Sequence, residues 1–172
     1  IGLIADTHIS SVSQRMLPDP EVLHGVARAF RGVDLILHAG DIYTSPVLDW
    51  LEELAPVVAA RGNGDSQIKN DPRVKDRQLL ILDGLRVGVV HEIYYPDTPW
   101  RPQEWTMDQH FGGRVDVLVY GDTHRSVVYV WKGTFVVNPG SPSPSEAFFG
   151  LGTVGILETD GGRPRVSILR LR

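Results

Sequence analysis

The 172-residue sequence contains no cysteine. This absence excludes disulfide cross-links, zinc sites built on thiolates and thiol nucleophiles. The sequence also lacks a hydrophobic run near the ~20 residues that a membrane-spanning helix requires, and it shows no secretory signal pattern. Although the sequence does not begin with Met, we expect a cytoplasmic enzyme without a membrane partner.

Positive charge is also scarce. The 17 Lys and Arg residues stand against 21 Asp and Glu residues, which gives a net charge of −4, and they form no basic block. Binding to a nucleic-acid polymer or a membrane surface is therefore not expected, because both require concentrated positive charge. The length and the ordinary apolar content predict one domain over residues 1–172 with a sizeable core.

The first half of the chain alternates short apolar runs with amphipathic segments. The runs at 1–5, 33–38 and 57–60 lack polar alternation, which is typical of buried parallel strands. Helices are predicted between them, beginning at Pro20 and Ser45, since each segment has proline near its start and one apolar face. Every strand delivers polar residues at its carboxyl end, the edge where open α/β sheets bind ligands.

The second half of the chain is mostly antiparallel. Hairpins are predicted over Asp83-Gly84, Lys132-Gly133 and the turn at 160–162, with a short helix from Pro102 and a buried strand at 115–120 between them. Together the halves predict an α/β fold with two packed β-sheets, the first flanked by helices. A single mixed sheet is the alternative that hairpins alone would also allow.

Metal-ligating residue types follow five of these strands. Asp6 and His8 end the first strand, and because they lie two residues apart in extended chain they point the same way and can meet one cation. A core histidine or a loop aspartate explains any one such residue, but five recurrences are harder to attribute to coincidence. The full set of candidate metal ligands is Asp6, His8, Asp41, Asn63, His91, Asp122 and His124.

The motifs resemble those of a known family. The order Asp-x-His, Gly-Asp, Gly-Asn-x-Asp, His, Gly-x-x-His and Asn-Pro-Gly-Ser is similar to that of the calcineurin-like metallophosphoesterases and covers the whole chain. The short length and the sequence 138–141 resemble the small bacterial and archaeal phosphodiesterase branch, which includes the retromer scaffold subunit Vps29. The resemblance implies a four-layer architecture of two packed mixed β-sheets flanked by helices.

The resemblance also implies a site for two divalent metal ions. The first metal is expected to take the ligands Asp6, His8, Asp41 and His124. Asp41 is expected to bridge to the second metal, whose remaining ligands are Asn63, His91 and Asp122. Two cations roughly 3.5–4 Å apart can clamp both oxygens of an in-line phosphoryl displacement.

The expected function is hydrolysis of a phosphodiester or phosphomonoester of a small molecule or nucleotide by a metal-bridging hydroxide. Asp41, Asn63 and His91 are the expected catalytic residues, and Asn63 is also expected to donate its NH₂ to a phosphate oxygen. Arg15 and Arg125 lie near ligands and are candidate phosphate-binding residues, although a solvated surface role is equally open. The alternative is a non-catalytic protein-interaction scaffold, as in Vps29.

Two positions depart from the family pattern. Asp122 stands where the family usually has His, and the added negative charge favours hard metals. Mn²⁺ is therefore the expected metal, with Mg²⁺, Fe, Ni²⁺ or Zn²⁺ as alternatives. Gly64 stands where larger relatives have a His that protonates the leaving group, so leaving groups that depart easily are favoured. Gly64 could instead be there to permit a turn with positive φ.

Several other residues carry weaker expectations. His38 is expected to support a ligand or to lie in the core, and His110 is expected on a helix surface. The aromatic residues between 94 and 105, with Trp105 as the last, are expected in a small core or an oligomer contact rather than a base-stacking lid. Homo-oligomerisation stays open.

Overall fold

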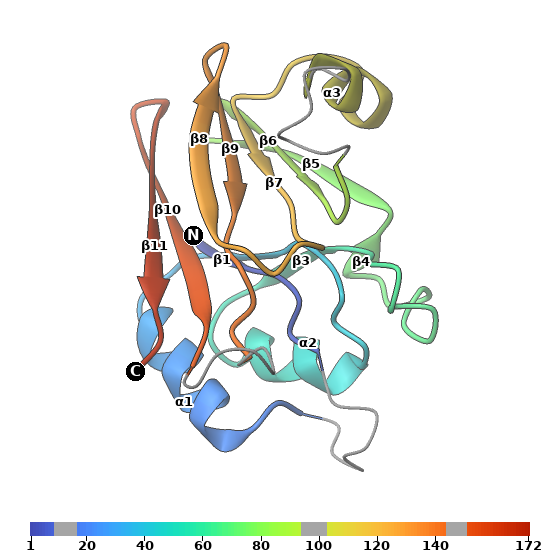
Figure 1. Ribbon diagram of the computed structural model, residues 1–172, viewed down its shortest axis with the longest axis vertical. Helices are drawn as coiled ribbons and strands as arrows, with labels where there is room; N and C mark the ends of the chain where they lie inside the picture. Colours follow the sequence, from blue (N-terminus) through green and yellow to red (C-terminus); the bar gives the residue numbers. More distant parts are fainter. Residues whose placement is uncertain (9–16, 94–102, 144–150) are drawn as a thin grey trace.

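The structure is a computed structural model that describes residues 1–8, 17–93, 103–143 and 151–172. Two β-sheets pack face to face, and helices cover their outer faces (Figure 1). The alternative of a single mixed sheet is therefore wrong. No helix within these ranges is long and apolar enough to cross a membrane.

The first sheet has the strand order β11-β10-β1-β2-β3-β4. Neighbours from β1 to β4 are parallel, whereas β10 is antiparallel to both β1 and β11. The sheet is mixed, and its parallel half consists of the buried apolar runs that the sequence predicted. Its strands are β1 (Gly2–Ile4), β2 (Ile36–His38), β3 (Val57–Ala60), β4 (Val74–Lys75), β10 (Thr153–Asp160) and β11 (Arg163–Arg170).

The second sheet has the strand order β5-β6-β7-β9-β8. Its central strands β6, β7 and β9 are parallel, and the edge strands β5 and β8 are antiparallel to their neighbours. Both edge strands are formed by the predicted hairpins. The strands are β5 (Arg77–Leu82), β6 (Leu85–Val90), β7 (Val117–Val119), β8 (Val127–Trp131) and β9 (Thr134–Asn138).

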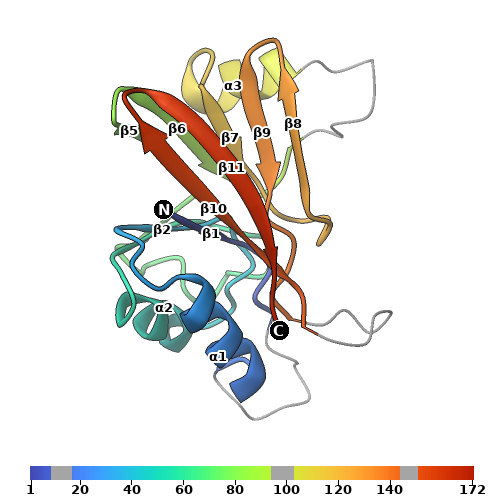
Figure 2. The ribbon, with the colours of Figure 1, turned by 90° about the vertical axis from the view of Figure 1, so that its left-hand side faces the viewer.

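Within the described residues, three helices complete a four-layer arrangement, which confirms the predicted fold. Helices α1 (Pro20–Ala29) and α2 (Ser45–Glu52) lie below the first sheet in Figure 1, and α3 (Gln103–Phe111) lies at the opposite end above the second. Figure 2 shows the same separation from the side. Three apolar clusters fill the spaces between the four layers, and the middle cluster, between the sheets, contains Leu3 and Val119.

Some boundaries differ from the prediction. The strands expected at 33–38 and 115–120 are shorter, because only Ile36–His38 and Val117–Val119 have strand partners. Strand β4 was not expected; it is two residues long and has no sequence periodicity, and it exists because it pairs with the end of β3. Pro102, the expected start of α3, lies outside the described residues.

Candidate metal centre

The two sheets present the carboxyl ends of their parallel strands at one common edge. Asp6, Asp41 and Asn63 follow β1, β2 and β3 of the first sheet, while His91 follows β6 of the second. The loop after β7 adds Asp122 and His124. Four of these residues have left-handed backbone conformations, which non-glycine residues rarely adopt and which concentrate at functional sites. They are Asp6 (φ 52°), Asp41 (φ 57°), Asp122 (φ 68°) and His124 (φ 56°).

Asp6 is the buried centre of this edge. Its Oδ1 accepts a hydrogen bond of 3.1 Å from the backbone N–H of Asp122. Within the described ranges, its buried Oδ2 has no hydrogen-bond partner. Burial raises the pKa of Asp6 to about 7, since water no longer stabilises the carboxylate. A buried carboxylate oxygen without a donor is the arrangement that a metal ion would satisfy.

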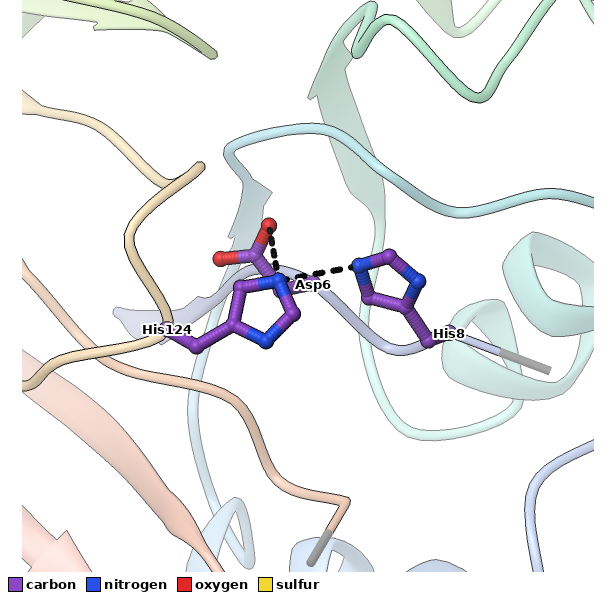
Figure 3. Close-up of side chains that lie close together, drawn as sticks. All are labelled: Asp6, His8 and His124. Carbon is purple, nitrogen blue, oxygen red and sulfur yellow. Dashed lines mark hydrogen bonds and ion pairs between the residues drawn. The ribbon is translucent and has the colours of Figure 1, made fainter. Parts of the chain in front are cut away.

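A first group of ligand atoms surrounds Asp6 on the solvent side. Figure 3 shows the rings of His8 and His124 turned toward each other beside the Asp6 carboxylate. The two Nε2 atoms lie 3.0 Å apart, and His124 Nε2 lies 3.8 Å from Asp6 Oδ1. Burial and the neighbouring His8 lower the pKa of His124. A neutral imidazole has a ring-nitrogen lone pair to give to a cation, so this trio can hold one.

Asp41 connects this trio to a second group. Its Oδ2 lies 3.3 Å from His8 Nε2, and its Oδ1 lies 3.5 Å from His91 Nε2. Burial alone would raise the pKa of Asp41, but hydrogen bonds from His8 and from the Gly64 N–H (2.8 Å) outweigh burial and lower it. The hydrogen bond to Asp41 also raises the pKa of His8. Asp6, Asp41 and His91 form the second possible metal-binding trio.

The orientation of His91 is fixed by the backbone. Its Nδ1 lies 2.8 Å from the carbonyl oxygen of Ala39, which can only accept, so Nδ1 carries the proton and donates. In the neutral ring Nε2 then has the lone pair, and it lies 3.0 Å from Asn63 Oδ1. A cation bound to both His91 Nε2 and Asn63 Oδ1 would account for two acceptor atoms at this distance.

Asp122 lies at the rim of the site. Its side chain is 47% exposed, and its Oδ1 is 4.0 Å from His91 Nε2. It belongs to neither trio of converging ligand atoms found among the described residues. Arg125, close to the rim in the chain, is exposed, and Arg15 lies outside the described residues.

Asp65 anchors the loops that hold the candidate ligands, in agreement with the sequence, which favours a supporting or turn residue here rather than a ligand. Its Oδ2 accepts from the N–H groups of Asp41 and Gly62, and its Oδ1 accepts from those of Ile42 and Tyr43, at 2.7–3.0 Å. Four backbone donors on one carboxylate fix the turn that gives Asp41 its left-handed conformation. The Gly-Asn-x-Asp motif contains this residue but does not reveal its partners.

His38 and Ser141 form hydrogen bonds with the backbone beside the candidate ligands. Buried His38 accepts from the Gly40 N–H at 3.1 Å, and burial, reinforced by the nearby His91, lowers its pKa to about 3, so the ring is neutral. The Ser141 hydroxyl donates to the Asp6 carbonyl at 2.7 Å, although 135 residues separate the two. The Asn-Pro-Gly-Ser loop thus holds the start of the chain in place.

Gly64 has a steric role that differs from the expected one. Gly64 does not have a positive φ, so the expectation of a positive-φ turn is wrong. A Cβ at this position would lie 2.8 Å from the Tyr43 ring, and the Gly64 N–H is needed for Asp41. Any side chain here would displace Tyr43, whose ring packs 4.8 Å from that of His8.

The fold and the cluster define an α/β protein with two groups of possible metal ligands at the ends of its strands. Residues 1–162 match the calcineurin-like phosphoesterase superfamily domain. A curated relative, a probable metallophosphoesterase of Methanothermobacter thermautotrophicus, is 33% identical over 171 residues, which is 99% of this chain and 91% of the relative. The chain therefore belongs to the calcineurin-like phosphoesterase superfamily, and the predicted class of metal-dependent phosphoesterases is confirmed.

Two further proteins, one curated relative and one solved structure, are similar to this chain. A phosphodiesterase of Methanocaldococcus jannaschii, MJ0936, is 26% identical over 177 residues, covering 98% of each chain. The crystal structure of Vps29 complexed with Zn²⁺ from Entamoeba histolytica superimposes with a TM-score of 0.68 at 19% identity, covering 98% of this chain and 97% of Vps29. The second likeness shows the fold alone.

Proposed function

We propose that the protein hydrolyses a phosphodiester of a small molecule or nucleotide at two divalent metal ions. The position of Asp41 carries this proposal, since its two oxygens face His8 and His91 at 3.3 and 3.5 Å. A carboxylate between two sets of ligands can give one oxygen to each ion. The relative MJ0936, named a phosphodiesterase, supports a diester as the substrate.

The protein residues would hold and orient the reacting groups. Two bound ions supply a hydroxide nucleophile near neutral pH and neutralise charge on the phosphoryl group. Asp6 must lose its proton to bind metal, and its pKa of about 7 makes binding stronger as the pH rises through that value. The exposed Asn63 can turn its NH₂ toward a phosphoryl oxygen while its Oδ1 faces His91.

The charge of the ligand set favours hard metals. With Asp6, Asp41 and Asp122 ionised, three carboxylates against two dications leave a formal charge of +1. We propose Mn²⁺ as the native metal, because oxygen-rich sites suit Mn²⁺ and Mg²⁺ better than softer ions.

Hydrolysis of bis(p-nitrophenyl) phosphate tests the proposal. We expect Mn²⁺ to stimulate hydrolysis, and Asp41→Ala to reduce it by about 10³-fold or more because the bridging ligand is lost. Asp34→Ala is the matched control, since Asp34 is exposed and lies before β2 at the opposite end of that strand. Activity retained by Asp41→Ala would reject the assignment.

A scaffold without catalysis is the second candidate. The exposed position of Asp122, which belongs to neither trio of ligand atoms among the described residues, favours it. Elemental analysis after Mn²⁺ incubation separates the two, because an enzyme with a dinuclear centre retains about two equivalents per chain. One equivalent or none would favour the scaffold.

A further inference from the structure

A cavity of about 540 Å³ opens beside the candidate metal centre. Asn63 and His91 line it, so the centre and the cavity share a wall. Its other walls come from the β4–β5 junction, the end of β6 and helix α3. This volume is within the roughly 300–1,000 Å³ of small-molecule sites. A substrate with its phosphorus at the metal centre can therefore place one arm in this cavity.

Arg77 gives the cavity a positive charge. The pairing of β5 with β6 sets Arg77 opposite Val90, the residue before His91. The cavity's other arginine, Arg61, is bound to Asp76 at 2.8 Å. Arg77 forms no ion pair with another described residue. Its guanidinium can thus hold a phosphate near the metal centre, and guanidinium geometry suits phosphate.

Two other parts of the cavity wall have side chains that can contact the base and the ribose of a nucleotide. Trp105 on α3 lines the cavity and is 43% exposed, and indole rings are side chains on which bases stack. Glu92 lines the cavity too, and carboxylates bind ribose hydroxyls in dinucleotide-binding folds. His110, expected on the helix surface, also faces the cavity, and burial together with Arg77 lowers its pKa, so its ring is a neutral hydrogen-bonding group.

Gly64 limits which leaving groups can depart. It carries no side chain that could protonate a leaving oxygen, and Tyr43 fills the space where one would lie. A sugar alkoxide needs such a proton, whereas a phosphate leaves as a stable anion near neutral pH. A leaving group that departs as a phosphate needs no acid at Gly64, and Arg77 can bind it.

We propose that the cavity binds a nucleoside monophosphate as the leaving half of a pyrophosphate diester, a step that rests on the proposed function. Hydroxide oxygen bonds to the phosphorus at the metal centre, and the bond from that phosphorus to the bridging oxygen breaks. The electron pair stays with the bridging oxygen, which departs as part of the nucleotide's phosphate, held by Arg77. No oxidant, reductant or proton donor at residue 64 is needed.

Calorimetry of the Mn²⁺-loaded protein tests the cavity without turnover. The probes are AMP, ribose 5-phosphate and adenosine, and AMP should bind about tenfold more tightly than either fragment. Arg77→Gln should weaken AMP and ribose 5-phosphate by about tenfold and leave adenosine unchanged, because only the phosphate contact is lost. Trp105→Ala should weaken AMP and adenosine but not ribose 5-phosphate. Arg163→Gln, on exposed β11 of the other sheet, is the control and should change none of them.

Hydrolysis separates failure of this inference from failure of the proposed function. The wild-type protein should cleave diadenosine diphosphate to AMP with a kcat/KM at least tenfold above that for bis(p-nitrophenyl) phosphate. Cleavage of neither substrate rejects the proposed function. Cleavage of the nitrophenyl diester without this preference, or AMP binding that is equal in wild type and folded Arg77→Gln, overturns the cavity assignment and leaves the proposed function intact.

Discussion

The two trios of ligand atoms share Asp6 but differ in chemistry and in exposure. The trio of Asp6, His8 and His124 has one carboxylate and two imidazoles, and His124 is exposed to solvent. The trio of Asp6, Asp41 and His91 has two carboxylates and is wholly buried. Carboxylates suit hard ions and imidazoles suit borderline ions. The two positions of this centre should therefore differ in metal preference.

The buried trio is also held more firmly. Asp65 fixes the loop of Asp41 with three backbone hydrogen bonds, and the Ala39 carbonyl fixes the His91 ring. In the open trio, the His8 ring instead contacts other side chains of the site, those of Asp41, His124 and Tyr43. A preorganised site loses less entropy on binding, so the buried position should fill first when metal is added.

Loss of the shared ligand should have the largest effect. Asp6→Asn removes a carboxylate from both trios, and we expect Mn²⁺-dependent diester hydrolysis to fall by about 10³-fold or more. Steady-state kinetics measures this, with Asp34→Asn as the exposed control. Activity within tenfold of wild type would mean that Asp6 does not serve both positions.

Replacing one histidine should empty one metal position and leave the other filled. We expect His8→Ala and His91→Ala each to retain about one metal equivalent and to lose activity by about 10²-fold, since only one ion is released. In equal amounts of Mn²⁺ and Zn²⁺, His8→Ala should retain more Mn²⁺ and His91→Ala more Zn²⁺. Elemental analysis of both variants decides this, and identical metal content in the two would contradict the difference between the trios.

Stability of the metal-free protein should depend on the charge of Asp6. Its folded pKa of about 7 lies above the ordinary 3.8, so the folded protein binds more protons than the unfolded chain between these values. The contribution of Asp6 to stability therefore falls as the pH rises from about 4 to 7. Without metal, Asp6→Asn should be more stable than wild type at pH 8 by about 2–4 kcal/mol and nearly equal at pH 4. Urea unfolding in a chelator measures both, and equal stability at pH 8 would refute the buried charge.

The smallest effect is expected at the rim. Asp122→His removes one negative charge beside His91, so inorganic phosphate should inhibit hydrolysis several-fold more strongly. Inhibition constants for wild type and Asp122→His measure this change. Since Asp122 is 47% exposed, solvent screens much of its charge. A change above about 10²-fold would show instead that Asp122 is a full metal ligand.

The candidate ligands could be selected from the sequence because each lies within a few residues after a strand. Parallel strands such as β1, β2 and β3 end at one edge, so residues after them converge whatever the details of the loops. The loop details were not predictable. Asp65 binds N–H groups more than 20 residues away, and Ser141 reaches Asp6 across the whole chain. Such partners depend on tertiary packing rather than on local pattern.

The cavity was the larger omission. The sequence favoured a helix surface for His110 and a small core or oligomer contact for Trp105. The direction in which their side chains point depends on how α3 packs on the second sheet. A Cβ at Gly88 would lie 2.7 Å from the Phe111 ring, so this glycine lets α3 approach closely. The contact brings the helix against β6, and Trp105 and His110 line the cavity beside His91. A lone glycine within a strand indicates close approach of another element, but not which one.

The proposed dinuclear centre is tested most directly by anomalous scattering from crystals grown with Mn²⁺. Two peaks should appear roughly 3.5–4 Å apart, with Asp41 between them and Asp6 in contact with the cluster. A single peak, or peaks remote from Asp41, would contradict the account.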